Sequence, residues 1–290
     1  MKIVYMGTPE IAAVTLENML AVGDEVAAVV TQPDRPKGRG HGLAYSEVKR
    51  VAAAHGLPVY QPERVKEEEF LSCMERLAPE LIVVAAFGQI LPKRLLDMPK
   101  YGCINVHASL LPKYRGAAPI QYAILNGECE TGVTIQYMAQ GIDTGDMITR
   151  EVVAVAPDET GGSLHDKLAE AGCVALRRAI GQIADGTAVR TPQDEAQASH
   201  VGMLSKEMGR LDFSQPADAL ERMVRAFNPW PSAYTVLDGK ILKFFRCEAV
   251  PLSAKELQRG KESAFCCGMV SAVEADSFTV LTGDGGLTVR

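Results

Sequence analysis

The sequence lacks any apolar stretch of the roughly 18 residues that a membrane-spanning helix requires, because charged residues or turn clusters interrupt every apolar run. A leader pattern is missing too. The strand-like segment 2–6 has no charged and apolar leader before it, and no Arg- and Ser-rich transit segment. We therefore expect a cytoplasmic protein that does not span a membrane.

Paired cysteines are also absent. The seven cysteines are odd in number and scattered along the chain, and no two of them form a C-x-x-C pair. Such a pattern is typical of reduced thiols and argues against a disulfide framework or a zinc site.

Common cofactor and nucleophile motifs are missing as well. Gly7-Thr8-Pro9 follows the first apolar segment but does not continue as G-x-G-x-x-G, and no Walker-type lysine follows a glycine-rich loop. The G-x-S-x-G elbow of serine hydrolases is absent. These absences disfavour NAD, ATP and a covalent serine intermediate.

The composition that remains is that of an ordinary globular protein. The chain has 290 residues, of which 47% are hydrophobic and 23% charged, enough for two domains of common size. Lys and Arg equal Asp and Glu in number over 206–290, so the whole net charge of −6 lies in 1–205. Because phosphate binding requires cationic surface, any contact with nucleic acid must be local.

Apolar strands alternate with amphipathic helices along the first two thirds of the chain. This alternation predicts an α/β domain with a Rossmann-like, mostly parallel sheet. We expect Thr8 to cap the first helix, with Pro9 at its first helical position. The strands that we expect are 3–6, 26–31, 81–86 and 104–106, with antiparallel additions at 133–138 and 147–155, and the helices are 46–55, 67–77, 120–125 and 163–184.

A boundary is predicted where the chain becomes polar and loses its periodicity. Residues 1–190 are expected to form the catalytic domain and 191–205 a linker. Over 206–290, one helical pattern ends at Asn228-Pro229-Trp230-Pro231 and short strand patterns follow. We expect a small, OB-like C-terminal β-barrel there.

Three polar residues are candidates for chemistry. Asn105 and His107 are at i and i+2 of an apolar strand and therefore share one face. The Pro- and Gly-bearing segment 109–116 follows at the end of the strand where open α/β sheets bind ligands. Asp143 lies in a glycine-rich turn, 141–146. Taken singly, each residue is more often structural: a turn cap, a buried histidine with satisfied hydrogen bonds, and a turn acid.

Taken together, these residues match a longer pattern. Asn-x-His-x-Ser-Leu-Leu-Pro-x-x-x-Gly followed by Asp-x-Gly resembles the folate-dependent formyltransferase family, and 86–92 is similar to that family's pterin-binding segment. The resemblance implies 10-formyltetrahydrofolate as formyl donor and Asn105, His107 and Asp143 as catalytic residues. The residues that it implies for folate binding are Phe87, Gly88, Ile90, Leu91, Ser109, Leu110, Leu111 and Pro112.

The chemistry of formyl transfer explains these residue types. Transfer from folate N10 to an amine passes through a tetrahedral intermediate, which needs hydrogen-bond donors for its oxyanion and a path for the amine proton. The Asn105 amide and a protonated His107 can serve as these hydrogen-bond donors. Asp143 can keep His107 charged and relay protons through a water. No metal is implied, because one histidine with one distant acid lacks the three ligands of a catalytic zinc.

The segment 31–42 bears on the acceptor. It carries Arg35, Lys37 and Arg39 against Asp34, and resembles the tRNA-contacting insertion of the family members that act on Met-tRNA. Its charge alone would fit an ordinary solvated loop. With the appended C-terminal domain, the resemblance implies that initiator Met-tRNA is the acceptor, that the reaction serves translation initiation, and that the C-terminal domain assists tRNA binding.

Two alternatives stay open at this point. Family members that act on sugar amines carry a similar appended domain, so the acceptor is alternatively a sugar amine or another small amine. A non-catalytic module that binds folate or tRNA is the other alternative, although binding alone does not require Asn105, His107 and Asp143 together. A formylation assay with and without tRNA distinguishes these hypotheses.

Overall fold

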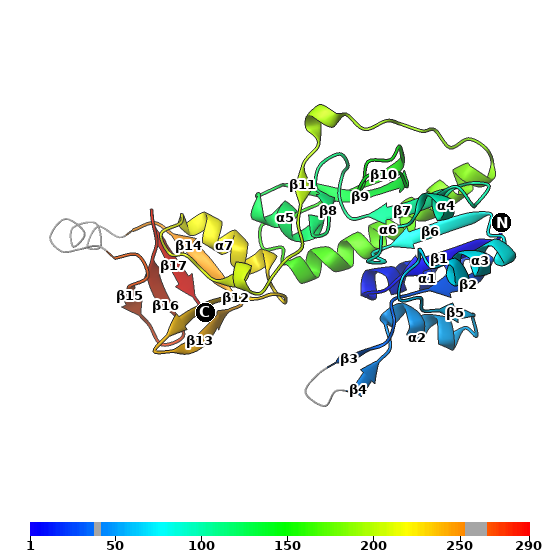
Figure 1. Cartoon of the computed structure of the whole chain (residues 1–290). Helices are drawn as coiled ribbons and strands as arrows, with labels where there is room; N and C mark the ends of the chain where they lie inside the picture. Colours follow the sequence, from blue (N-terminus) through cyan, green and yellow to red (C-terminus); the bar gives the residue numbers. More distant parts are fainter. Residues whose placement is uncertain (38–41, 253–265) are drawn as a thin grey trace. The chain divides into compact units, whose positions relative to one another are not determined.

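The structure is a computed structural model that describes residues 1–37, 42–252 and 266–290 (Figure 1). The chain divides into two compact units. Unit 1 comprises Met1–Gly116, Glu130–Ala154 and His165–His200, and unit 2 comprises Ala117–Cys129, Val155–Leu164 and Val201–Arg290.

A seven-stranded sheet in the order β10-β9-β7-β6-β1-β2-β5 forms the centre of unit 1 (Figure 1). Five strands run parallel, whereas β9 and β10 are antiparallel additions at one edge. Because β1 lies between β2 and β6, the chain extends the sheet first on one side and then on the other. The carboxyl ends of β1 and β6 therefore flank a topological switch point, where such sheets bind ligands. The strands are β1 (Ile3–Gly7), β2 (Val26–Val30), β5 (Val59–Tyr60), β6 (Leu81–Ala85), β7 (Cys103–His107), β9 (Glu130–Tyr137) and β10 (Met147–Ala154).

Helices cover both faces of this sheet. Val4 and Met6 of β1 point into an apolar cluster with residues of α3 (Glu68–Leu77) and α4 (Lys93–Leu96). Tyr5 points to the opposite face, where its hydroxyl donates to the Ala12 carbonyl of α1 (Glu10–Ala21) at 2.6 Å. On that face α1 packs against α2 (Glu47–Ala54).

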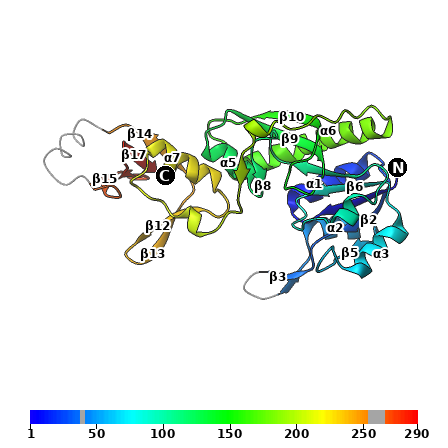
Figure 2. The same ribbon diagram turned by 45° about the horizontal axis from the view of Figure 1, so that its top comes forward.

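Helix α6 (Gly161–Ala184) also packs against the sheet in unit 1, and Figure 2 shows it from a second direction. The Thr149 hydroxyl of β10 donates to the Ala175 carbonyl at 3.1 Å. A Cβ on Gly172 would lie 3.3 Å from Val106 of β7, so glycine permits the close approach of helix and strand at this point.

The predicted α/β architecture is confirmed, with two local differences. Thr8 is not the cap of α1: Pro9 occupies the cap position without a side-chain hydrogen bond, and the Thr8 hydroxyl donates to the Phe87 carbonyl at 3.1 Å. The Thr8 hydroxyl, which the local sequence pattern assigns to the start of α1, thus bonds the Phe87 carbonyl beyond the end of β6. Within the segment predicted as a loop, β3 (Arg35–Lys37) pairs antiparallel with β4 (Gly42–Ala44).

Unit 2 contains antiparallel sheets, consistent with the predicted small C-terminal barrel. One sheet pairs β12 with β13, and the other has the order β14-β17-β16-β15. Leu220 and Val224 of α7 pack with Phe244 and Leu287 in its apolar core. The elements are α5 (Pro119–Leu125), α7 (Ala217–Ala226), β12 (Ala233–Leu237), β13 (Lys240–Phe244), β14 (Cys247–Val250), β15 (Val270–Val273), β16 (Phe278–Leu281) and β17 (Gly286–Val289).

Adjacent phenylalanines provide a test of the core of unit 2. Phe244 is 1% exposed and packs edge to face against Phe213, whereas Phe245 is 53% exposed. Phe244→Ala leaves a cavity and should lower the free energy of unfolding of unit 2 by about 3–5 kcal/mol. Denaturant unfolding followed by circular dichroism measures this change. Phe245→Ala is the matched control, and equal effects of the two substitutions would contradict this assignment of the core.

Candidate active site

Asn105 and His107 lie at the carboxyl end of β7, on one face of the strand. β7 pairs parallel with β6 and antiparallel with β9, where Asn105 faces Gln136 and His107 faces Thr134. His107 is 5% exposed and Asn105 is half-buried. The central sheet thus holds both side chains beside the carboxyl ends of its parallel strands.

Asp143 lies in the turn between β9 and β10, and its carboxylate is surrounded by hydrogen-bond donors. Oδ1 accepts from Asn105 Nδ2 at 3.3 Å and from Gln136 Nε2 at 2.8 Å. Oδ2 accepts from the Gly116 backbone N–H at 2.9 Å and lies 3.5 Å from His107 Nδ1. The structure therefore brings the three predicted catalytic residues together.

Both ring nitrogens of His107 face oxygen atoms. Nε2 lies 2.9 Å from the Tyr114 carbonyl, which only accepts hydrogen bonds, so this nitrogen carries the hydrogen. Nδ1 faces the Asp143 carboxylate across 3.5 Å, which is longer than a normal hydrogen bond. Nδ1 is therefore the ring nitrogen that can bind an additional group, such as a substrate atom or a water.

The turn itself is conformationally demanding. Asp143 adopts a positive φ of 52°, a left-handed conformation that aspartate tolerates better than most residues. A Cβ on Gly145 would lie 1.6 Å from the Tyr137 carbonyl oxygen, so only glycine fits there. The Asp-x-Gly pattern thus places a carboxylate beside β7 by folding the turn tightly onto the end of β9.

The segment after β7 is fixed to the sheet by polar contacts. The Ser109 hydroxyl donates to the Lys113 carbonyl at 2.6 Å, and the Leu111 N–H donates to the Thr134 hydroxyl at 3.1 Å. That hydroxyl in turn donates to the Ser109 carbonyl at 2.7 Å. Ser109 and Leu111 are fully buried, and Leu110 and Pro112 are half-buried.

The residues predicted to bind folate after β6 occupy different environments. Phe87 and Leu91 are buried in the apolar cluster beneath α3 and α4. Gly88 is exposed and Ile90 is 76% exposed, which is unusual for a large apolar side chain.

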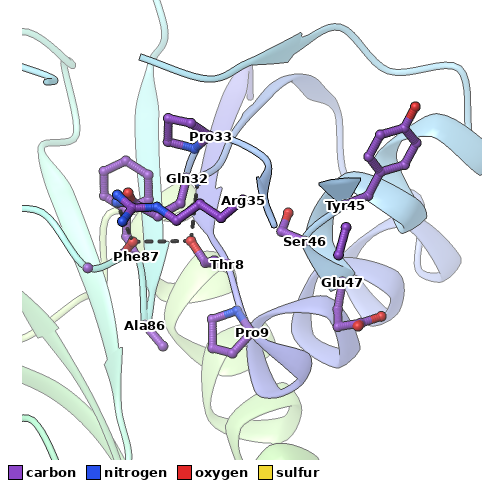
Figure 3. Close-up of a pocket in the computed structure, with 12 residues that line it drawn as sticks. Thr8, Pro9, Gln32, Pro33, Arg35, Tyr45, Ser46, Glu47, Ala86 and Phe87 are labelled. Atoms are coloured by element: carbon purple, nitrogen blue, oxygen red, sulfur yellow. Dashed lines mark hydrogen bonds between the residues drawn. The ribbon is translucent and has the colours of Figure 1, made fainter. Parts of the chain in front are cut away.

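A cavity of about 540 Å³ lies at the switch point of the sheet. Figure 3 shows Ala86 and Phe87 on one side of it and Tyr45, Ser46 and Glu47 on the other. The Phe87 carbonyl accepts hydrogen bonds from the side chains of Thr8 and Gln32, both at 3.1 Å. The residues that line the cavity are Thr8, Pro9, Gln32, Pro33, Arg35, Ala44, Tyr45, Ser46, Glu47, Ala86, Phe87 and Gly88.

The predicted tRNA-binding residues belong to the β3–β4 hairpin. Arg35 is exposed and lines the cavity, and Lys37 ends β3. Arg39 lies outside the described residues. The acid of this segment, Asp34, forms an ion pair with Lys49 of α2 at 2.5 Å. The hydrogen bond from Lys49 lowers the pKa of Asp34. The ion pair links the base of the hairpin to α2.

Comparison with protein families shows to which family the chain belongs. The model of the formyl transferase family matches residues 1–180, and the model of the formyl transferase C-terminal domain matches residues 203–290. The chain belongs to the formyl transferase family.

Relatives within the family are similar over the whole chain. The methionyl-tRNA formyltransferase of Agathobacter rectalis is 48% identical over 100% of this chain and 90% of its own length. That of Geobacter metallireducens is 44% identical over the same shares. That of Thiobacillus denitrificans is 53% identical over 87% of this chain and 81% of its own length.

Solved structures of distant formyltransferases share the fold. An N-formyltransferase from Helicobacter canadensis, solved with folinic acid and dTDP-3-aminofucose, matches with a TM-score of 0.70 at 19% identity, over 100% of this chain and 98% of that one. The sugar 3N-formyltransferase WlaRD, solved with dTDP and 5-N-formyl-THF, matches with a TM-score of 0.70 at 18% identity, over 100% and 96%.

In the part of the chain that the structure describes, no three His, Cys, Asp or Glu side chains are grouped so that they could hold a metal ion. Over the same residues, no helix is both long and apolar enough to cross a membrane.

Sequence reasoning missed several residues that lie around the Asp143 turn. Gln136 is buried and donates to Asp143; its alternation with Thr134 on an apolar strand was the available signal. Arg115, only 1% exposed, forms hydrogen bonds with Gln193 and Glu195. Hydrogen bonding with Glu195 raises the pKa of Arg115 and lowers that of Glu195. The segment 191–205, expected as a linker, gave no local signal for these contacts.

The close packing of Gly145 is testable. In Gly145→Ala the methyl group must displace the Tyr137 carbonyl, which should destabilise unit 1 by about 1–3 kcal/mol, the cost of overpacking a close-packed site. Gly181→Ala is the control, because its Cβ meets open space in α6 and should raise stability slightly. Thermal unfolding measures both, and a neutral Gly145→Ala would show that the turn is looser than described.

Proposed function

We propose that this formyltransferase transfers the formyl group of 10-formyltetrahydrofolate to the α-amine of methionine on initiator tRNA, in the cytoplasm, for translation initiation. The observation that carries the formyl transfer is the convergence of Asn105 and His107 on the Asp143 carboxylate. The acceptor is supported by relatives of 44–48% identity over the whole chain that are methionyl-tRNA formyltransferases.

The geometry supports a part in acyl transfer for each of the three side chains. The reaction forms a bond between the acceptor nitrogen and the formyl carbon, breaks the bond from that carbon to folate N10, and moves a proton from the amine to N10. The Asn105 amide has two hydrogens and uses one on Asp143, which leaves one for the developing oxyanion. Protonated His107 donates to the same oxygen through Nδ1, which lies 3.5 Å from the Asp143 carboxylate.

Asp143 is suited to the proton path. Its carboxylate faces His107 Nδ1, so it stabilises the charged imidazolium while the oxyanion develops. The 3.5 Å separation leaves both atoms able to bind a third group, and Asp143 accepts the amine proton directly or through a water. No covalent bond to the enzyme is needed.

We assign the two substrates to two different sides of the site. We place reduced folate against 87–91 and 109–112, which follow β6 and β7. The exposed Ile90 side chain and the exposed Gly88, whose φ is 88°, support an apolar ring there. We place the acceptor end on the opposite side of the cavity, below the hairpin. Arg35 is exposed and lines the cavity, and Asp34 does not offset its charge because Lys49 already pairs with it.

Substitution of the three central residues tests the chemistry. His107→Ala and Asp143→Ala should each reduce formyl transfer to a small residual rate while leaving the Kd for folate nearly unchanged, because both act on charge that develops in the transition state. Asn105→Ala should lower kcat by about 10²–10³-fold, the usual effect of losing one oxyanion donor. Single-turnover formylation and folate titration measure these quantities, with the exposed His55→Ala as control. Parallel losses of folate affinity and rate would make them binding residues instead.

Charge reversal in the hairpin tests the acceptor. Arg35→Glu should raise KM for Met-tRNA and leave the KM for folate unchanged, because a negative charge then faces phosphates. Its log KM should also depend less steeply on log salt, by about 0.7–0.9, the loss of one phosphate contact. Lys66→Glu, also exposed, alters the net charge equally away from the cavity and is the control.

The same assay separates the alternative acceptors. Met-tRNA, a nucleotide-linked amino sugar and glycinamide ribonucleotide are offered together with the formyl donor. Preferential formylation of Met-tRNA is expected. Preferential formylation of the amino sugar, with no effect of Arg35→Glu, would instead indicate a formyltransferase that acts on small amines. The proposed roles of Asn105, His107 and Asp143 would not change.

A further inference from the structure

The Asp143 turn is held from outside the motif by Gln193. Gln193 Nε2 donates to the backbone carbonyls of Asp143 and Gly145, both at 2.8 Å. Nε2 also lies 3.3 Å from Oε1 of Gln136, but an amide nitrogen has two hydrogens, and the two shorter contacts with the turn use both. They cap both sides of a turn whose Asp143 backbone has a left-handed φ of 52°.

Arg115 orients the Gln193 amide. Its Nε and Nη2 both donate to Gln193 Oε1, at 3.0 and 2.8 Å, and its Nη1 and Nη2 donate to Glu195 at 2.9 and 2.7 Å. A guanidinium only donates, so the amide oxygen must face Arg115 and the amide nitrogen must face the turn. Because Arg115 is 1% exposed, its fork is fixed in this orientation.

The other end of the same short strand binds the carboxylate. Gly116, next to Arg115 in β8 (Arg115–Gly116), donates its N–H to Asp143 Oδ2 at 2.9 Å. Gln193 therefore holds the backbone of Asp143 and Gly116 holds its side chain. The two contacts are linked through Arg115 into one closed network.

We propose that Gln193, oriented by Arg115, is a positioning residue that fixes the Asp143 carboxylate beside His107. This inference rests on the proposed catalytic function of Asp143. Gln193 bonds the turn through its backbone and reaches no reacting atom, so it acts only through Asp143. Loss of its two donors leaves two carbonyls without partners and releases the turn, and a shift of about 1 Å in a catalytic group costs up to about 10²-fold in rate.

Gln193→Glu tests this with little change of shape. The substitution keeps an oxygen for Arg115 but replaces the donating nitrogen with a second acceptor. The control is Gln197→Glu, which adds the same charge in the same segment. The Gln197 side chain donates to the exposed side chain of Asp194, away from the Asp143 turn. Gln193→Glu should lower kcat by about 10–100-fold with the KM for folate unchanged, and Gln197→Glu should retain the original kcat.

A double-mutant cycle separates positioning from a general structural role. In the Asp143→Ala background, Gln193→Glu should change the residual rate by less than about twofold, because its effect passes through the missing carboxylate. Equal losses of kcat in both backgrounds would overturn the proposal. So would an unchanged kcat in Gln193→Glu.

Hydrogen exchange at the Gly116 amide provides a readout that does not depend on the acceptor. This N–H is bonded to Asp143 Oδ2, so release of the turn should accelerate its exchange by about tenfold or more in Gln193→Glu and not in Gln197→Glu. Unchanged exchange would overturn the positioning role. The original chain could fail to formylate Met-tRNA while Gln193→Glu still accelerated exchange at Gly116. That result would contradict the proposed function but support the role of Gln193 in fixing the Asp143 turn.

Discussion

The site depends on the hydrogen bonds that converge on the Asp143 carboxylate. Its donors are Asn105 in β7, Gln136 in β9 and the Gly116 amide in β8, and all three strands belong to unit 1. A half-buried carboxylate is stable only when such donors replace water. The same bonds therefore fix the position of the turn relative to the sheet and the direction in which the carboxylate faces His107.

Much of the fold of unit 1 could be predicted because its signals are local. The strand predicted at 3–6 is β1 (Ile3–Gly7), and the helix predicted at 163–184 is α6 (Gly161–Ala184). The common face of Asn105 and His107 follows from their spacing on a strand. β5, two residues long, and the β3–β4 hairpin were not predicted, because short strands are defined by the partner with which they pair.

The site could be predicted only in part, for a related reason. Nothing in the glycine-rich turn places Asp143 near His107; that expectation came from the resemblance of the combined pattern. Gln193 is 50 residues beyond Asp143 in a polar segment without periodicity, and it reaches the turn only through tertiary structure. Thr8 shows the converse, since its hydroxyl suits a local cap but bonds a carbonyl 79 residues away.

The pairing of Asp34 with Lys49 has an electrostatic consequence. A chain with a net charge of −6 repels a polyanion at long range, and 1–205 carries all of that charge. Because Asp34 is paired with Lys49 at the base of the hairpin, this acid does not offset the charge of the exposed Arg35. A polyanion that approached the chain would therefore meet net repulsion except where such a local positive charge faced it.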